Sequence, residues 1–267
     1  MKDFRKIFRT PKNPKLDEIS TDETLGLDES AAEAMLEKNK ALLGKLGYRL
    51  HAEGRRSLLV VLQAMDTAGK DGVIRHVMTG LNPQGVRVTS FKAPTPIELS
   101  HDFLWRIHPA VPGQGEIAVF NRSHYEDVLI QRVKKMVPKK VWSQRYGQIV
   151  EFEALLAENG TAIVKIFLHI SKQVQAERLQ ARIDDPDKNW KFQMGDIKER
   201  EYWDDYMRAY EAAIRKCDRP AAPWYIIPSD RKWFRNFAVS QILCETLKKM
   251  NPKVPDPIPG LDAIKIV

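Results

Sequence analysis

The segment Ser57–His76 brings a lysine, two aspartates and two glycines into one short turn; it reads SLLVVLQAMDTAGKDGVIRH. Before the turn, Leu58–Leu62 is a continuous apolar run, which is typical of a strand buried on both faces. After the turn, apolar residues recur at helical spacing: Val73, Ile74, Val77 and Met78. A strand, a glycine-containing turn and a helix in this order favour an anion cradle, because turn N–H groups and the helix N-terminus face the anion. The residues that we expect to bind phosphate here are Ala68, Gly69, Lys70 and Asp71.

The turn is similar to the Walker A pattern G-x-x-x-x-G-K-[ST], but it differs at two positions. Ala64 takes the place of the first glycine, and Asp71 stands where a Ser or Thr hydroxyl normally contacts magnesium. Asp66, inside the turn, offers hard carboxylate oxygens that suit Mg²⁺, with Mn²⁺ as the alternative metal. We expect Asp66 and its neighbour Thr67 to contact a nucleotide as well. The structural alternative is a tight turn with a surface lysine; we disfavour it because the strand and the helix stand where phosphate binding needs them.

A second group of polar residues follows another short buried strand, Glu116–Phe120. In P-loop enzymes an acid near such a strand orders magnesium, but here Asn121 stands in its place and offers an uncharged oxygen. Arg122 would place a planar, charged donor fork beside the phosphates. Asp127 is the nearest acid able to bind the metal or the nucleotide. The structural alternative is a strand-to-helix turn with polar capping residues.

Further basic residues are candidates for binding a polyanion. They are Lys92, Arg106, Arg178, Arg182, Lys188 and Lys191. Arg178 and Arg182 are four residues apart and share one helical face. The polar, aromatic segment after them is typical of a lid, which closes on phosphates and excludes water. Solvated surface side chains are the alternative interpretation of all six.

Apolar stretches near positions 58, 86, 116, 161 and 224, with helical patterns between them, predict five strands in a parallel sheet. The expected fold class is α/β: a three-layer P-loop kinase-like fold with helices on both faces and a helical lid. We divide the chain into a basic N-terminal arm (1–28, extended through residue 24), a P-loop domain (29–250) with its lid at about 178–196, and a C-terminal tail (251–267).

The expected helices include a long one from Asp28 to about Glu53 that ends at Gly54. Others are expected at Pro96–Ile107, at Arg145–Asn159 and after Ser171, and two more begin at a capping Asp196 and at Ser229–Asp230. The helix after Asp196 carries an aromatic stripe, which we interpret as core or oligomer interface rather than a base-stacking surface.

Composition limits the range of functions. Lys and Arg number 43 against 35 Asp and Glu, and the net charge of +8 suits an acidic partner such as polyphosphate, a nucleotide or a nucleic acid. Cys217 and Cys244 lack metal-ligand or disulfide spacing, as expected in a reducing cytoplasm. No apolar run approaches the ~20 residues of a membrane span, and the start lacks the apolar core of a signal peptide. We expect a cytoplasmic protein without a membrane partner.

Six motifs in fixed order resemble those of the polyphosphate kinase 2 family. They are MDTAGKDGVIRHV, SFKAPTPIELSHDFLWRIH, FNRSHYEDV, HISKQVQAERLQAR, KNWKF and PWYIIPSDRKWFRN. The resemblance covers roughly residues 30–250, which is nearly the whole expected domain. It implies reversible, metal-assisted phosphoryl transfer between inorganic polyphosphate and a nucleoside phosphate, so that AMP, ADP and ATP are the nucleotide partners. It also implies a homo-oligomer, either a dimer or a tetramer.

The resemblance assigns roles to individual residues. Asp66 matches the family's magnesium-binding carboxylate, Lys70 its phosphate-binding lysine and Arg122 the arginine after the third strand. Asp127 completes the expected catalytic set, and Asn121 and Asp127 join Asp66 as expected metal ligands. Asn121, where many members carry Asp, looks like the subgroup that accepts both AMP and ADP. The lid residues named above fall on the family's lid positions.

Two other functions remain open at this point. An ATP-dependent nucleoside monophosphate kinase would share the loop and the lid and differ in its phosphate donor. A basic nucleic-acid-binding protein with a degenerate loop would show salt-sensitive oligonucleotide binding without turnover. We rank it last and expect no nucleic-acid partner, because the sequence has no recognised nucleic-acid motif.

Overall fold

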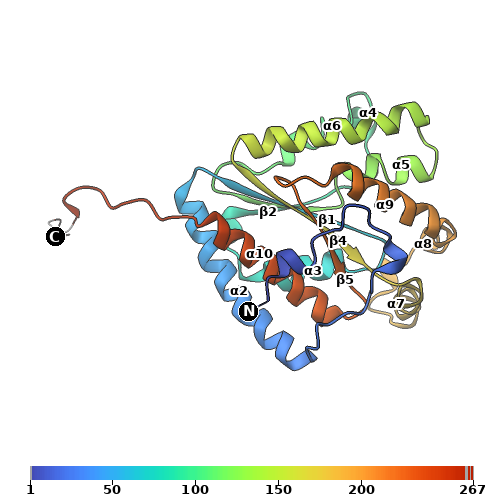
Figure 1. Cartoon of the computed structure of the whole chain (residues 1–267), viewed down its shortest axis with the longest axis horizontal. Helices are drawn as coiled ribbons and strands as arrows, with labels where there is room; N and C mark the ends of the chain where they lie inside the picture. Colours follow the sequence, from blue (N-terminus) through green and yellow to red (C-terminus); the bar gives the residue numbers. More distant parts are fainter. Residues whose placement is uncertain (1, 262–263, 265, 267) are drawn as a thin grey trace.

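The computed structural model describes residues 2–261, 264 and 266, and its centre is one five-stranded parallel sheet (Figure 1). The strands are β1 (Ser57–Ala64), β2 (Val86–Ser90), β3 (Ile117–Asn121), β4 (Thr161–His169) and β5 (Trp224–Pro228). Their order in the sheet is β2-β3-β1-β4-β5, which confirms the predicted α/β class. β1 is central and buried along its whole length, so the turn after it leaves the middle of the carboxyl edge of the sheet.

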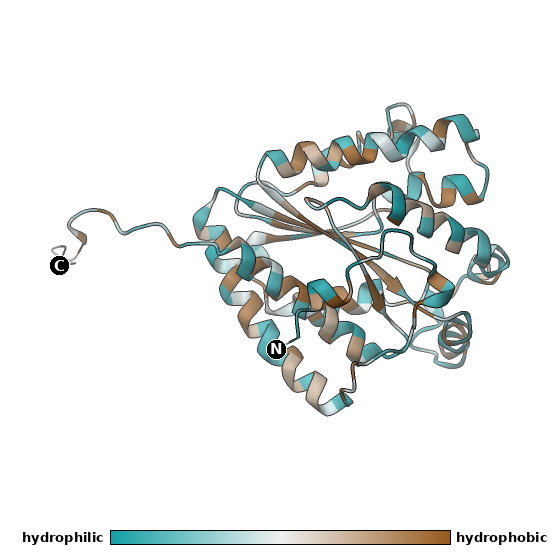
Figure 2. Cartoon of the chain, in the orientation of Figure 1, coloured by the Kyte–Doolittle hydropathy of each residue, from teal (hydrophilic) through white to brown (hydrophobic). Residues whose placement is uncertain are grey.

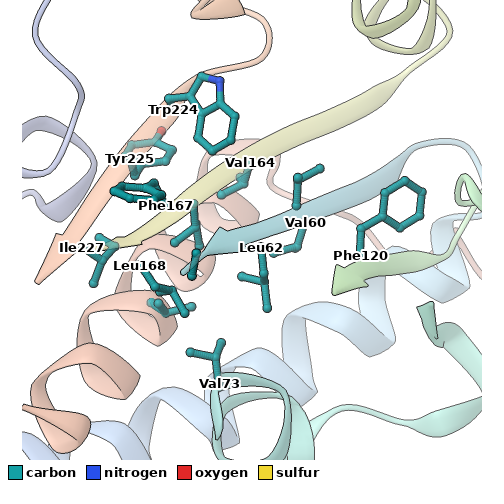
Figure 3. Packing of buried hydrophobic residues seen from close by; sticks show 14 of the residues in the cluster. Val60, Leu62, Val73, Phe120, Val164, Phe167, Leu168, Trp224, Tyr225 and Ile227 are labelled. Atoms are coloured by element: carbon teal, nitrogen blue, oxygen red, sulfur yellow. The ribbon is translucent and has the colours of Figure 1, made fainter. Parts of the chain in front are cut away.

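Helices cover both faces of the sheet and complete the predicted three layers. One face carries α2 (Glu29–Glu53), α3 (Lys70–Val77) and α10 (Lys232–Met250), and the other carries α6 (Lys139–Glu158) and α9 (Trp203–Cys217) (Figure 1). The hydrophobic residues concentrate on the strands and on the inner sides of the helices (Figure 2). Close to the loop after β1, Val73 of α3 lies below Leu62 (Figure 3), which anchors the start of α3 in the core.

Short helices and helical turns occur in the connections between the strands. The segment predicted as a lid, about 178–196, covers the end of α7 (Lys172–Asp184), η6 (Asn189–Lys191) and the start of α8 (Met194–Glu199), and η7 (Arg200–Tyr202) follows it. The remaining helical turns are η2 (Met78–Gly80), η3 (Pro83–Gly85), α4 (Pro96–Leu99), η4 (His108–Ala110), η5 (His124–Asp127) and α5 (Ile130–Val133). The described part of the predicted tail, 251–267, runs away from the body (Figure 1); residues 262–263, 265 and 267 lie outside the described residues.

The N-terminal arm folds onto the body and closes one edge of the sheet. The backbone N–H of Thr10 donates to the Trp224 carbonyl, and the N–H of Ile226 donates to the Phe8 carbonyl, so the arm lies antiparallel against β5. The expectation of a fully extended arm is wrong, because the arm also contains α1 (Phe4–Ile7) and η1 (Leu16–Glu18). The Asp3 side chain caps α1, and Phe4 packs against Phe237 of α10, which favours a helical turn.

Two predicted helix boundaries are wrong for local reasons. The helix expected over Pro96–Ile107 ends at Leu99, because the Asp102 carboxylate accepts the N–H of Leu104 and this side-chain turn competes with helix formation. The helix expected from Arg145 begins earlier, at Lys139. Pro138 directly precedes it, and a proline is well tolerated at a helix start, where its missing N–H removes no helical hydrogen bond.

Two predicted caps are also wrong, because other segments use the carboxylates. Asp196 lies inside α8 and pairs with Arg182 (3.4 Å between Nη1 and Oδ2), and α9 starts only at Trp203. Asp230 accepts hydrogen bonds from the Ser171 N–H and the Thr21 hydroxyl, and Arg231 takes the N-cap position of α10 without a side-chain cap. The cap of α7 by Ser171 is confirmed, since its hydroxyl accepts the Val174 N–H.

Candidate active site

The loop between β1 and α3 has the backbone shape of an anion cradle. Thr67 (φ 64°) and Gly69 (φ 111°) adopt left-handed conformations that alternate with ordinary ones, the pattern that turns successive N–H groups toward one point. In the described part of the chain, the N–H groups of Gly69, Lys70 and Asp71 have no hydrogen-bond acceptor. Three free donors at the start of a helix are suited to bind a phosphate group.

Three successive carbonyl groups of the same loop, those of Asp66, Thr67 and Ala68, accept hydrogen bonds from side chains of other elements. Gln175 Nε2 donates to the Asp66 carbonyl (3.1 Å), and Arg178 Nη1 donates to the Thr67 carbonyl (3.0 Å). Arg235 Nη1 donates to the Ala68 carbonyl (3.0 Å). The structure therefore places Arg178, a predicted phosphate ligand, on the carbonyl side of the loop.

Lys70 is buried at the start of α3, with its ammonium group inside the loop. Nζ donates to the Ala64 carbonyl at 3.0 Å and lies 3.4 Å from the Met65 carbonyl. Burial and the neighbouring Arg122 lower the pKa of Lys70 to about 8, against the partly compensating charge of Asp66. An ammonium group that contacts only neutral carbonyl oxygens is poorly compensated, and a phosphate oxygen is the partner that would restore its charge balance.

Asp66 and Arg122 meet across the carboxyl edge of the sheet. Arg122 Nη2 donates to Asp66 Oδ1 at 2.8 Å, and the opposite end of the fork lies 4.0 Å from Glu126. Arg122 has a positive φ of 62°, and its N–H donates to the Leu62 carbonyl of β1, which turns its side chain back toward the loop. The structure thus brings together two of the predicted catalytic residues, Asp66 and Arg122.

Glu126 is a residue of this site that sequence reasoning missed. Burial raises the pKa of its carboxyl group, and the charges that act on it are those of Arg122, Lys70 and Asp66. Its neighbour Asp127, chosen from the sequence, instead pairs with Arg145 of α6 (2.8 Å between Nη1 and Oδ1), and burial raises its pKa to about 6. The sequence alone carried no signal that favoured Glu126 over Asp127, because the helical turn η5 determines which of the two carboxylates faces Arg122.

The Asn121 side chain connects three elements of the fold by hydrogen bonds. Its Nδ2 donates to Asp71 Oδ1 at 2.7 Å and to Ser90 Oγ at 3.3 Å. These contacts join the end of β3 to α3 and β2. Its amide oxygen has no donor within the described residues and remains available as a ligand oxygen.

The donor set fits a magnesium ion that is held partly by phosphate. Among the described residues no cluster of three His, Cys, Asp or Glu side chains forms a complete metal cage. Mg²⁺ commonly takes only one or two protein carboxylates and completes its shell with phosphates and water. Asp66 and Glu126 supply two carboxylates that repel each other, an arrangement that a cation relieves.

The other predicted phosphate ligands fall into two groups. Arg106 Nη1 donates to the Lys92 carbonyl at 2.9 Å, so these two residues lie together on the connection after β2. In the lid, Arg182 Nη1 donates to the Lys191 carbonyl at 3.2 Å, Lys191 lies over the Trp190 ring, and Lys188 pairs with Asp185. The structure brings the lid residues together with one another.

The chain is similar to known proteins over nearly its whole length. The family model "Polyphosphate kinase 2 (PPK2)" matches residues 26–255. The chain is 54% identical over 241 residues to an AMP/ADP-polyphosphate phosphotransferase of Meiothermus ruber, covering 90% of each chain. It is 48% identical over 230 residues to an ADP-polyphosphate phosphotransferase of Rhodopseudomonas palustris, covering 82% of this chain and 80% of the relative.

A solved structure has the same fold over nearly the whole chain. The crystal structure of polyphosphate kinase 2 from Arthrobacter aurescens TC1 superposes with a TM-score of 0.96 at 43% identity. The match covers 98% of this chain and 95% of that one. The similarity therefore includes the arm, the sheet and the lid together.

Proposed function

Because the chain belongs to the polyphosphate kinase 2 family, we propose that it transfers phosphoryl groups from inorganic polyphosphate to AMP and ADP, giving ADP and ATP, and that it catalyses the reverse reaction. The observation that carries this proposal is the loop after β1, with its free N–H groups around the buried, poorly compensated Lys70. The site has N–H groups and an ammonium group that can bind a phosphate chain. The names of the relatives indicate polyphosphate as the phosphoryl donor and AMP or ADP as the acceptor.

The chemistry asks the protein mainly for positioning and charge neutralisation. The loop N–H groups and Lys70 would bind the terminal phosphates of polyphosphate, and Arg122 would lie beside the phosphoryl group that moves. An oxygen of the AMP or ADP phosphate attacks the terminal phosphorus, and the bond to the bridging oxygen breaks, leaving polyphosphate one unit shorter. The attacking oxygen is already ionised near neutral pH, so no strong general base is needed.

We propose Mg²⁺ as the metal, with Mn²⁺ as the alternative. Asp66, Asn121 and an acid of the segment after β3, either Glu126 or Asp127, would hold it. Asp127 was the acid expected from the sequence, and the location of Glu126 favours Glu126 in that role. When bound, the metal neutralises charge on the reacting phosphates. The residues themselves orient the phosphates: Arg122 is fixed by Asp66, and Asp71 is fixed by Asn121.

The lid residues and the assembly belong to the same proposal. Arg182, Lys188 and Lys191, with Lys92 and Arg106 from the connection after β2, would bind the phosphate chain, and lid closure would exclude water that competes as acceptor. We further propose a homo-oligomer, a dimer or a tetramer, in the cytoplasm without a nucleic-acid partner. Within the described residues no helix has the length and hydrophobicity to cross a membrane, and both cysteines are free and buried.

The decisive experiment follows nucleotides by chromatography. Purified protein is incubated with AMP and magnesium, and either polyphosphate or ATP is the donor. We expect ADP and ATP with polyphosphate, and no product when a chelator removes the metal. Product with ATP alone would identify an ATP-dependent monophosphate kinase. The names of the relatives favour polyphosphate over this alternative.

A further inference from the structure

Arg235 is a buried arginine next to the phosphate-binding loop; it lies in the motif PWYIIPSDRKWFRN, but the sequence alone assigned it no role. It lies in the first turn of α10 and is only 3% exposed. Its Nη1 donates to the Ala68 carbonyl, and its Nε and Nη2 donate to Asn236 Oδ1 at 3.2 and 2.9 Å. Within the described part of the chain, no carboxylate lies at ion-pair distance from its guanidinium group. A buried arginine normally has such a partner, so this one needs an explanation.

Two glycines of the loop make room for the Arg235 side chain. A methyl group on Gly69 would overlap the guanidinium group, and one on Gly72 would lie 2.7 Å from Nη2. Gly69 also needs its positive φ, but Gly72 lies in α3 with an ordinary helical φ. Close approach of the guanidinium group is therefore the structural reason for glycine at position 72.

A second guanidinium group shares the Ala68 carbonyl with Arg235. Arg178 Nη1 lies 3.4 Å from that oxygen and 3.0 Å from the Thr67 carbonyl, and its Nη2 donates to the carbonyls of Ser229 and Asp230. Burial, together with the like charge of Arg178, lowers the pKa of Arg235 to about 9. Two guanidinium groups thus lie together on the carbonyl side of the loop, and the free N–H groups lie on its other side.

We propose that Arg235 is a positioning residue of the phosphate-binding loop: with Arg178 it holds the Ala68 carbonyl on the back of the loop, so that the following N–H groups face the bound phosphate. This inference rests on the proposed function of the loop, and it adds a residue from α10 that does not touch the substrate. A peptide group has its carbonyl and N–H on opposite sides. Fixing the Ala68 carbonyl therefore fixes the direction of the Gly69 N–H.

The arrangement also has an electrostatic consequence. The two guanidinium groups repel each other in the free protein, and a polyphosphate anion on the opposite side of the loop offsets their charge. Loss of Arg235 should therefore weaken anion binding without a matching loss of stability in the free protein. A side chain that only filled space would have the opposite signature, with lower stability and unchanged affinity.

The test compares Arg235→Gln and Arg235→Lys with a matched control, Arg215→Gln, which removes the same charge from an exposed position of α9. Inorganic triphosphate is the binding probe, measured by calorimetry and by the shift in thermal midpoint. For Arg235→Gln we expect at least a tenfold rise in the triphosphate Kd and in the KM for polyphosphate, with the KM for AMP changed less than twofold. Arg235→Lys should recover part of the affinity, and Arg215→Gln should behave as wild type.

A second variant tests the same contact without changing any charge. Gly72→Ala should displace the guanidinium group and raise the triphosphate Kd severalfold, although alanine favours the helix itself. In the Arg235→Gln background the same change should add little, because the contact is already lost. Additive effects in this cycle, or an unchanged Kd in Arg235→Gln, would overturn the proposal. If Arg235→Gln does not fold, the Kd of Gly72→Ala decides alone.

The readouts separate this inference from the proposed function. If the wild type binds triphosphate but transfers no phosphate to AMP, the proposed activity fails while the binding data still test Arg235. If the wild type is active and the variants keep its Kd and KM, only the positioning role fails. If the wild type does not bind triphosphate, the loop is not an anion site and both are wrong.

Discussion

The segment Arg122–Asp127 contributes side chains to two groups of charged residues that behave differently. One is a closed cluster of His124, Tyr125, Glu153 and Lys165. Lys165 is fully buried, and its ammonium group donates to Glu153, to the Tyr125 hydroxyl and to the Cys217 carbonyl. Glu153 also accepts from Tyr125 and contacts His124 Nε2 at 3.2 Å. All three donors of the ammonium group are used, and the carboxylate is compensated.

The other is an open cluster of Asp66, Lys70, Arg122 and Glu126. Lys70 contacts only carbonyl oxygens, and the two carboxylates share one guanidinium group. In the closed cluster burial would raise the pKa of Glu153, but Lys165 and His124 outweigh it and lower that pKa. In the open cluster burial prevails: it raises the pKa of Glu126 and lowers that of Lys70.

The difference teaches that burial and charge alone do not mark a functional site. Both clusters are charged and contain buried side chains, and both use side chains of the same short segment. In the closed cluster each charge has its opposite within the fold, which suits a structural role. The open cluster lacks partners that a phosphate and a metal would supply. His124 belongs to the closed cluster, so it is fully buried and not placed to serve as a covalent phosphate carrier.

The largest effect is expected when the open cluster loses its ammonium group. Lys70→Ala should lower kcat by roughly 10³-fold or more, because an ammonium group fixed beside developing phosphate charge is a major source of transition-state stabilisation. Its folding should be unimpaired, since the buried charge is poorly compensated in the free protein. Chromatographic assay of ADP formation and thermal unfolding measure the two quantities. Substantial remaining activity in a folded variant would contradict the role assigned to Lys70.

The closed cluster should respond in the opposite way. Glu153→Gln leaves Lys165 as an uncompensated buried charge and should lower the free energy of unfolding by about 3 kcal/mol. The KM values for polyphosphate and AMP should remain near those of the wild type at a temperature where the variant is folded. Urea denaturation with steady-state kinetics provides both measurements.

A double variant controls for this prediction. Glu153→Gln combined with Lys165→Met removes both charges and should recover part of the lost stability. A rise in KM without loss of stability in Glu153→Gln would show that the closed cluster takes part in binding, and the comparison between the two clusters would fail.

The sequence predicted the sheet and its layers because four of the five strands are short apolar runs, β2 alternates and is rich in β-branched residues, and helical patterns lie between them. Leu58–Leu62 and Glu116–Phe120 needed no tertiary information, since strands buried on both faces have no alternation to misjudge. The helix after Pro96 was mispredicted because its apolar spacing continues past Leu99 while the Asp102 side chain ends it. The spacing of apolar residues carries no information about such a local hydrogen bond.

The site was predictable where one motif contained the whole geometry. Asp66 and Lys70 lie in the turn itself, and Arg122 follows a buried strand directly. Glu126 was missed because adjacent Glu126 and Asp127 face different neighbours, and only the helical turn η5 determines which one faces the loop. Arg235 is 167 residues from Ala68 along the chain, and its contact arises only when α10 packs beside α3.

Choosing between these two carboxylates is the next test of the open cluster. Glu126→Gln should lower kcat by about 10- to 100-fold, in the range typical of a positioned acidic or basic group. Asp127→Asn should have less than about a fivefold effect, because the Asp127 carboxylate pairs with Arg145. Rates at saturating magnesium and a magnesium titration should be compared. A stronger effect at Asp127 would restore the assignment made from the sequence.

The smallest effect concerns the proton on Lys70. Its pKa is about 8 in the folded protein against 10.5 as the ordinary value, and Arg122, Asp66, Glu126 and Asp71 are the charged groups that act on it. Between these two pH values the unfolded chain binds more protons than the folded one. The free energy of unfolding should therefore rise with pH across this window relative to Lys70→Met, by at most about 1.4 kcal/mol per pH unit.

Triphosphate affinity should change in the opposite direction over the same window. The anion binds the ammonium form, so above a pH of about 8 the wild-type Kd should rise by up to about tenfold per pH unit. Lys70→Arg keeps its charge and should show a flat profile, which separates Lys70 from the other titrating groups. Parallel profiles for the two proteins would mean that the Lys70 proton is not coupled to the anion. Lys70 of the open cluster would then resemble Lys165 of the closed cluster, in that contacts within the protein alone would determine its protonation.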